Sequence, residues 1–125
     1  MTERIRVLLA DDHNVVRAGL HAVLATEPDL AVVGECATAE EAVRLAAAGD
    51  VDVVLMDLQF GDGMDGATAT AAITAAADAP RVLVLTTYDA DADILAAIEA
   101  GASGYLLKDA APDDLTHAIR AAANG

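Results

Sequence analysis

The residues of this chain that could do chemistry stand at the ends of apolar runs. Val53 to Met56 are four consecutive large apolar residues, and Asp57 follows them directly. Four such residues in a row are typical of a strand that is buried on both faces, and the acidic and glycine-rich flanks favour a strand over a helix. Asp57 is then either a residue that simply ends a strand or a ligand-binding group at the carboxyl end of a central strand.

Other apolar runs end on polar side chains in the same way. We predict strands over four further segments: Arg4–Ala10, Leu30–Cys36, Arg81–Thr86 and Gly104–Lys108. Asp11 and Asp12 follow the first of them, and Thr86 and Lys108 end the last two. The carboxyl ends of parallel strands meet at one edge of a sheet, where open α/β sheets bind their ligands. This regularity favours a functional site over a set of unrelated turns.

The chemistry of this set is that of a phosphoryl-transfer site. Asp11, Asp12 and Asp57 would repel one another unless a cation joins them, and oxygen ligands of this number suit Mg²⁺. A metal beside Asp57 would neutralise charge during transfer of a phosphoryl group to its oxygen. Lys108 could supply a second positive charge, and Thr86 a hydroxyl donor. If each residue is considered alone, Lys108 is more often a solvated lysine at a strand end, and Thr86 an ordinary strand residue.

Amphipathic or alanine-rich segments separate the predicted strands. Asp12 or Asn14 could cap the first helix, and Thr38 and Glu41 have the spacing of a capping box at the second. The third helix is predicted over 66–78, before a proline. The fourth should end at a glycine, and the fifth should begin at a proline.

Strands and helices therefore alternate five times within 125 residues. Such alternation implies right-handed crossovers and one doubly wound α/β domain, in which a parallel five-stranded sheet carries helices on both faces.

Composition excludes several classes of function. Seven basic and 21 acidic residues give a net charge of −14, which opposes binding to a nucleic-acid backbone. The single cysteine, Cys36, cannot form an internal disulfide. The N-terminus lacks the apolar region of a signal peptide, and no apolar stretch is long enough to span a membrane. We therefore expect a soluble cytoplasmic protein.

The whole chain resembles the receiver domain of a two-component response regulator. The acidic pair, Asp57, Thr86 and Lys108 match that family's motif positions, and Tyr105, three residues before Lys108, matches its switch aromatic residue. The segment 101–109 (GASGYLLKD) is similar to the NarL/FixJ (LuxR-type) branch. The resemblance implies a flavodoxin-like sheet with the strand order 2-1-3-4-5.

The resemblance also implies a mechanism. A histidine kinase would donate a phosphoryl group to Asp57, Lys108 and Thr86 would move to hold it, and Tyr105 would turn inward. A homodimer would form on activation. The domain would be no enzyme beyond assisting its own phosphorylation and autodephosphorylation.

Further site residues follow from the same resemblance. Asp12, Asp57 and the backbone carbonyl of Gln59 would ligate Mg²⁺, and Asp11 would act mostly through water. Gln59, Thr87 and Tyr88 lie where the family tunes hydrolysis of the acyl phosphate. They are equally well read as simple loop residues. Here the segment 60–64 replaces the family's Met-Pro and contributes two glycines, so we expect a more mobile loop.

Alternative functions remain open at this point. A phosphohydrolase with an aspartyl nucleophile would need a general acid two residues after Asp57, where Gln59 stands. A nucleotide-binding module would need a glycine-rich or hydroxyl-rich loop after the first strand, not Asp11 and Asp12. We expect the chain to be truncated before a C-terminal helix-turn-helix domain that binds DNA. A stand-alone receiver that signals through a protein partner is the alternative.

Overall fold

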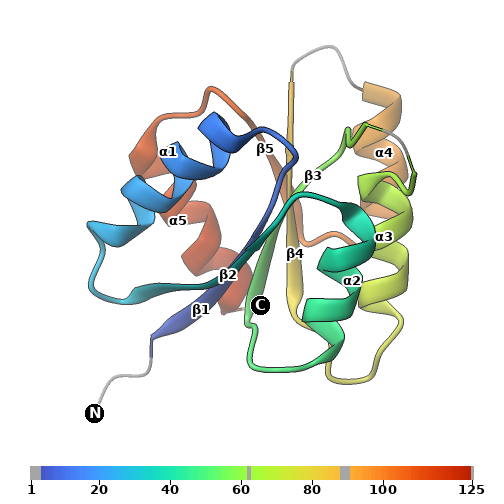
Figure 1. The fold of residues 1–125 in the computed structure, drawn as a ribbon, viewed down its shortest axis with the longest axis horizontal. Helices are drawn as coiled ribbons and strands as arrows, with labels where there is room; N and C mark the ends of the chain where they lie inside the picture. The colour runs from blue at the N-terminus through green and yellow to red at the C-terminus, as the bar shows by residue number, and fades with distance from the viewer. Residues whose placement is uncertain (1–3, 62, 88–90, 125) are drawn as a thin grey trace.

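A computed structural model describes residues 4–61, 63–87 and 91–124 of the chain. Its strands are β1 (Ile5–Ala10), β2 (Leu30–Cys36), β3 (Val53–Asp57), β4 (Arg81–Thr86) and β5 (Gly104–Leu107). Its helices are α1 (Asn14–Ala25), α2 (Ala39–Ala47), α3 (Gly66–Thr74), α4 (Asp91–Glu99) and α5 (Pro112–Ala123), and they alternate with the strands (Figure 1).

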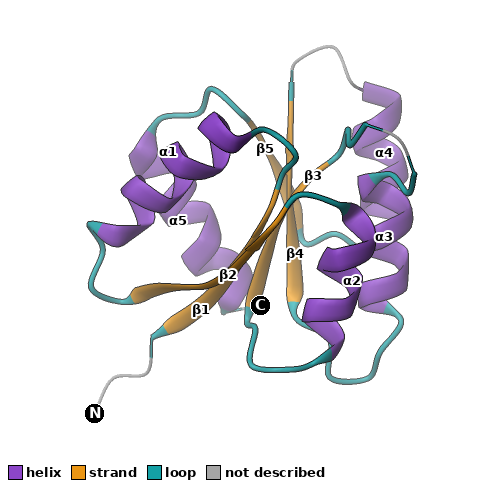
Figure 2. Ribbon diagram, viewed as in Figure 1, coloured by secondary structure: helices purple, strands orange, loops and turns teal. Residues whose placement is uncertain are grey.

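All four strand pairs are parallel, and the order across the sheet is β2-β1-β3-β4-β5. Helices α1 and α5 cover one face of this sheet, and α2, α3 and α4 cover the other (Figure 2). The predicted doubly wound sheet and its strand order are therefore confirmed. None of the helices in the described ranges is long and apolar enough to cross a membrane.

Strand β3 lies at the centre of the sheet and is buried on both faces. Val54 and Met56 belong to the core beneath α2, α3 and α4, whereas Val53 and Leu55 belong to the core beneath α1 and α5. All four side chains are at most 1% exposed. Alternate side chains of a strand point to opposite faces, which explains why the sequence here is apolar at every position.

The third helix is shorter than predicted. It ends at Thr74, and the alanines that follow form turns, with Ala76 donating to the carbonyl of Ile73. Ile73 is the only large apolar residue of this helix and is 4% exposed, while residues 75–78 are exposed. Alanine favours a helix, but a segment that buries no apolar area gains little from continuing one.

The predicted caps have mixed outcomes. Thr38 accepts a hydrogen bond from the amide of Glu41 at 3.1 Å, which confirms that Thr38 caps α2. The second half of the capping box is not seen among the described residues, because the Glu41 carboxylate lies 3.6 Å from Arg44 instead. The prediction that Asp12 or Asn14 caps α1 is wrong. The N-cap is His13, which makes no side-chain cap, and the side-chain oxygen of Asn14 instead accepts from Arg17.

Two strand boundaries also shift by one residue. Strand β1 begins at Ile5 and not at the preceding arginine, and β5 ends at Leu107. Lys108 therefore lies just outside the strand that was predicted to contain it. Its amide nevertheless donates to the carbonyl of Thr86 at 2.8 Å, so its backbone is held as firmly as a strand residue.

The start of α3 is fixed against the end of β3 by a close backbone approach. The amide of Gly66 donates to the carbonyl of Leu58 at 3.1 Å, and Asp65 caps the helix by accepting from the amide of Thr68 at 2.7 Å. A Cβ atom on Gly66 would lie 2.1 Å from the carbonyl oxygen of Asp57 and 2.7 Å from the Cα of Leu58. Only glycine fits at this position without moving the backbone that carries Asp57.

Replacement of this glycine tests the close approach. Gly66→Ala should lower the free energy of unfolding by about 2 kcal/mol or more, because backbone atoms must separate to admit the methyl group. Urea unfolding followed by circular dichroism measures the change. Gly19→Ala in α1 is the matched control, since no atom lies within 4 Å of a Cβ there. It should raise stability by about 0.5–1 kcal/mol. Equal midpoints for Gly66→Ala and the wild type would contradict this packing.

Candidate functional site

The backbone brings the predicted residues to one edge of the sheet. Asp11 directly follows β1, Asp57 ends the neighbouring strand β3, and Lys108 directly follows β5. The amide of Asp11 donates to the carbonyl of Cys36 at 3.1 Å, which continues the pairing of β1 with β2. The carboxyl ends of parallel strands thus position these three side chains together, as the sequence predicted.

Lys108 lies between two buried carboxylates. Its Nζ is 3.1 Å from Oδ1 of Asp57 and 3.2 Å from Oδ2 of Asp11. Both aspartates are 1% exposed, and the lysine side chain is 17% exposed. Two carboxylates shielded from water repel each other strongly, so a cation between them offsets much of the cost of burying them.

The charges of this group shift its pKa values. Burial, and then the charge of Asp11, raises the pKa of Asp57, and these effects outweigh the amide of Gln59 and the ammonium of Lys108, which lower it. For Lys108, burial lowers the pKa, but the ion pairs with Asp57 and Asp11 outweigh burial and raise it overall. Lys108 therefore stays charged at neutral pH, whereas ionisation of Asp57 lowers the stability of the folded state.

The two carboxylate oxygens of Asp57 have different surroundings. Oδ1 pairs with Lys108 and accepts from the amide of Gln59 at 3.2 Å. Oδ2 is buried and has no hydrogen-bond partner in the part of the chain that the structure describes. Buried polar atoms without partners are rare in proteins and are often found where a ligand or an ion binds. Oδ2 is thus the atom of Asp57 that is free to bond.

A group of four residues that could hold a metal includes Asp57. Asp11, Asp12, His13 and Asp57 each offer one ligand atom, and these atoms lie within 4.8 Å of one another. Asp12 and His13 are exposed, so a cation can enter from water and keep part of its hydration shell. Three carboxylates are the hard oxygen ligands that Mg²⁺ prefers. The residues present therefore fit a divalent cation.

Thr86 and Thr87 lie beside this group without joining it. Thr86 is 1% exposed, as a site residue at the end of β4 should be. Its hydroxyl, however, donates to the carbonyl of Thr87 at 3.1 Å, and no hydrogen bond joins it to Asp57 or Lys108 among the described residues. Thr87 itself is exposed. Donation from the Thr86 hydroxyl to a ligand would require this hydrogen bond to Thr87 to break.

The side chains of the remaining predicted residues point elsewhere, although the backbone amide of Gln59 contacts Asp57. The side-chain amide of Gln59 donates to Oδ2 of Asp93 at 3.2 Å, so this side chain joins the loop after β3 to helix α4. Ligation by the carbonyl of Gln59 stays a prediction. Tyr105 on β5 is 50% exposed, with its ring on the surface. Tyr88 lies outside the residues that the structure describes.

Two residues that contact the carboxylate group were not assigned a role from the sequence. Nδ1 of His13 lies 3.1 Å from Oδ1 of Asp11 and 3.0 Å from Oδ1 of Asp12. Arg17, one turn into α1, donates to the backbone carbonyl of Asp11 and to the side chain of Asn14. It thereby holds the loop that carries both aspartates. The position of His13 directly after the acidic pair was the available signal for it, and spacing offered none for Arg17.

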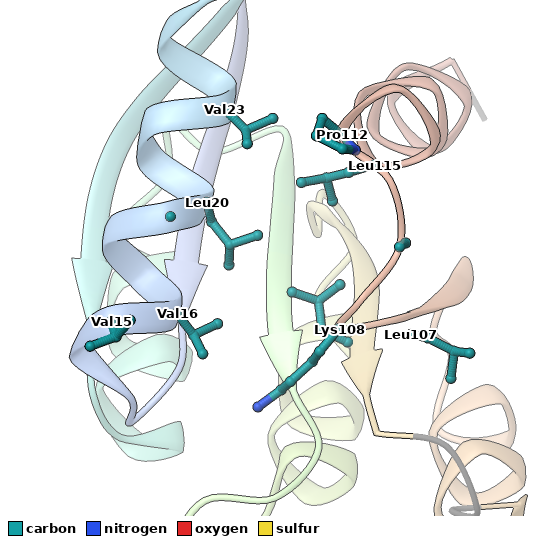
Figure 3. Close-up of a pocket in the computed structure, with 11 residues that line it drawn as sticks. Val15, Val16, Leu20, Val23, Leu107, Lys108, Pro112 and Leu115 are labelled. Carbon is teal, nitrogen blue, oxygen red and sulfur yellow. The ribbon is translucent and has the colours of Figure 1, made fainter.

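An apolar pocket of about 290 Å³ adjoins the carboxylate group. It lies between α1 on one side and Pro112 and Leu115 of α5 on the other, with Lys108 between them (Figure 3). Its rim carries two exposed apolar side chains, Val15 at 84% and Leu107 at 37% exposure. Lys108 therefore borders both the charged group and this pocket.

Comparisons with known proteins agree with this geometry. The family described as Response regulator receiver domain matches residues 7–120. The chain is 47% identical over 121 residues to the transcriptional regulatory protein LiaR of Bacillus subtilis and 40% identical over 120 residues to the nitrate/nitrite response regulator protein NarP of Escherichia coli. These matches cover 97% and 96% of this chain but 57% and 55% of the relatives, so the chain spans about half of their length.

A solved structure shows the same similarity. The signal receiver domain of a NarL response regulator from Mycobacterium tuberculosis matches with a TM-score of 0.91 and 35% sequence identity, covering 98% of each chain. The predicted receiver family and its NarL-type branch are therefore confirmed.

The raised pKa of Asp57 predicts how stability depends on pH. Asp57→Asn should raise the free energy of unfolding by about 1 kcal/mol at pH 7, because it removes a buried charge. The folded wild type binds the Asp57 proton more readily than the unfolded chain, so its stability falls as the pH rises through the raised pKa. The advantage of the variant should therefore disappear as the pH falls through that pKa. Urea unfolding at a series of pH values, without divalent cations, measures it.

Asp52→Asn is the matched control with the opposite sign. The hydrogen bond from the Arg6 side chain lowers the pKa of Asp52. This variant should be less stable than the wild type at pH 7, and the difference should shrink as the pH falls through the lowered pKa. The same sign for both variants would contradict the described charge distribution.

Proposed function

The chain belongs to the response regulator receiver family, and from this premise we propose that Asp57 accepts a phosphoryl group from a histidine kinase and so switches an output that regulates transcription. The observation that carries the proposal is the buried Oδ2 of Asp57, an unpartnered oxygen beside a lysine and a second buried carboxylate. A nucleophilic carboxylate needs one oxygen free to form a bond.

The residues of the chain suggest how the transfer proceeds. Oδ2 of Asp57 forms a bond to phosphorus as the bond from phosphorus to the kinase histidine nitrogen breaks, and the electron pair of that bond returns to the imidazole. The Nζ of Lys108, already 3.1 Å from Oδ1, balances the added negative charge. The hydroxyl of Thr86 turns from the carbonyl of Thr87 to donate to a phosphoryl oxygen.

Asp11, Asp12, Asp57 and the carbonyl of Gln59 would hold Mg²⁺ in this proposal. When bound, the ion neutralises negative charge at the carboxylates and on the phosphoryl oxygens. The cluster of ligand atoms within 4.8 Å supports this assignment. Gln59, Thr87 and Tyr88 would then influence the lifetime of the acyl phosphate.

The output is proposed from the relatives. LiaR is named a transcriptional regulatory protein and NarP a response regulator, and both extend well beyond the region that this chain matches. We place DNA binding in a further C-terminal domain, because the net charge of −14 opposes contact of this domain with phosphates. Inward rotation of Tyr105 and formation of a homodimer would transmit the signal in the cytoplasm. A stand-alone receiver acting on a protein partner is the second candidate.

The apolar pocket beside Lys108 is the surface that we assign to the kinase. A donor histidine must approach Oδ2 of Asp57, so the kinase must contact the residues around the carboxylates. Val15 stands just after the acidic loop, is 84% exposed and lines the pocket together with Leu107, so the pocket offers a partner an apolar surface next to Lys108. Contact there would bury apolar area and orient the donor.

Phosphorylation of Asp57 is tested by the mass of the intact protein. After incubation with Mg²⁺ and a small phosphodonor, the wild type should gain one phosphoryl group and Asp57→Asn none, because the variant lacks the nucleophile. Asp52→Asn, at the other end of β3, is the control and should be labelled like the wild type. Labelling of Asp57→Asn would move the acceptor elsewhere.

The kinase surface is tested by separating docking from chemistry. Val15→Asp should slow phosphoryl transfer from a histidine kinase by about tenfold, since a charge in the pocket opposes apolar contact. It should leave labelling by a small phosphodonor unchanged. Val33→Asp is the control, because Val33 is also exposed, at 48%, but lies on β2 and not in the pocket. Timed gels of both reactions give the rates, and equal slowing by the two variants would exclude the pocket as the docking surface.

A further inference from the structure

We propose that His13 supplies a nitrogen ligand to the acidic group, so that this site binds first-row transition-metal dications such as Co²⁺ more tightly than its carboxylates alone would. The inference rests on the proposed function, because it concerns the metal site beside Asp57. It adds a ligand that the acidic residues do not provide, and with it a different range of metals.

The position of the imidazole supports this assignment. Nδ1 of His13 is 3.1 Å from Oδ1 of Asp11 and 3.0 Å from Oδ1 of Asp12, so one ring nitrogen faces two carboxylates of the group. Two adjacent ligands of an octahedral ion with bonds of about 2.1 Å are separated by about 3 Å. The observed spacing is therefore that of neighbouring ligands around one ion.

The rest of the group is independently suited to a cation. Asp57, 1% exposed, contributes an oxygen within 4.8 Å of the other ligand atoms, and its Oδ2 is buried without a hydrogen-bond partner. His13 itself is 62% exposed along its side chain, so it borders water and can exchange between the carboxylates and an incoming ion. A buried side and an open side are what a site that binds ions from solution requires.

The chemistry of the ligands determines which metal ions the site binds more tightly. Mg²⁺ binds oxygen almost exclusively and gains little from an imidazole. Transition-metal dications bind imidazole nitrogen well, and their affinity for mixed nitrogen and oxygen sites rises from Mn²⁺ through Co²⁺ to Cu²⁺. His13 should therefore strengthen binding of Co²⁺ and leave binding of Mg²⁺ nearly unchanged.

A second histidine provides the comparison. Nδ1 of His21 lies 2.7 Å from Oε2 of Glu35, and its side chain is 50% exposed. It is an exposed imidazole next to a carboxylate, as His13 is, but among the described residues it belongs to no group of three or more side chains that could hold a metal. If pairing with a carboxylate were enough to bind a transition metal, both histidines would contribute.

Calorimetric titration of the full chain with Co²⁺ and with Mg²⁺ tests the proposal. His13→Ala should weaken Co²⁺ binding by at least about tenfold and change Mg²⁺ binding by less than about twofold. His21→Ala should change neither. The retained Mg²⁺ affinity shows that the variant is folded. In the wild type, Co²⁺ should also broaden the NMR signals of the His13 ring more than those of His21, which requires no variant.

The outcomes distinguish failure of the nitrogen ligand from failure of the proposed metal site. Equal effects of His13→Ala on the two ions, or unbroadened His13 signals with Co²⁺ bound, would overturn the nitrogen ligand and leave the proposed phosphoacceptor site intact. Wild-type protein that binds neither ion would overturn both the ligand and the proposed metal site.

Discussion

One ammonium group between two buried carboxylates is the interaction on which the functional edge of this sheet depends. Lys108 reaches both Asp11 and Asp57 at 3.1–3.2 Å, although the three residues belong to different strand ends. Without it, two charges shielded from water would face each other across neighbouring strands. The lysine thus makes it possible to keep a carboxylate buried and partly unpartnered, which is the state that a phosphoryl acceptor requires.

Most of the fold could be predicted from the sequence because its strongest signals are redundant. Each strand is an apolar run, and β3 alone indicates burial on both faces through Val53–Met56. The end of α3 was not predictable in the same way. Residues with high helix propensity continue to residue 78, but the last buried apolar side chain is that of Ile73. The helix ends where apolar burial ends. The predicted side-chain cap of α1 was wrong because Asn14 accepts from Arg17 and the loop before the helix is hydrogen-bonded to Asp11 instead.

The candidate site was predictable at the level of backbone positions and not at the level of side-chain directions. Parallel strands must bring Asp11, Asp57 and Lys108 to one edge, whatever the loops do. Contacts made by Arg17 and His13 depend on rotamers and on the path of a short loop. No periodicity encodes these. The same limit applies to Thr86, whose place at the end of β4 was predicted but whose hydroxyl is turned to a neighbouring carbonyl.

The packing close to Asp57 differs from the packing at the β5 edge of the sheet. Gly66 at the start of α3 is so close to the carbonyl of Asp57 that no methyl group fits between them, which leaves α3 no room to shift alone. At the edge of the sheet, β5 is only four residues long, pairs with β4 and not with β3, and exposes Tyr105 and Leu107. Strain introduced at Asp57 would therefore relax toward β5, where little packing must be broken. The segment that carries Lys108 is therefore the more easily displaced part of the carboxylate group.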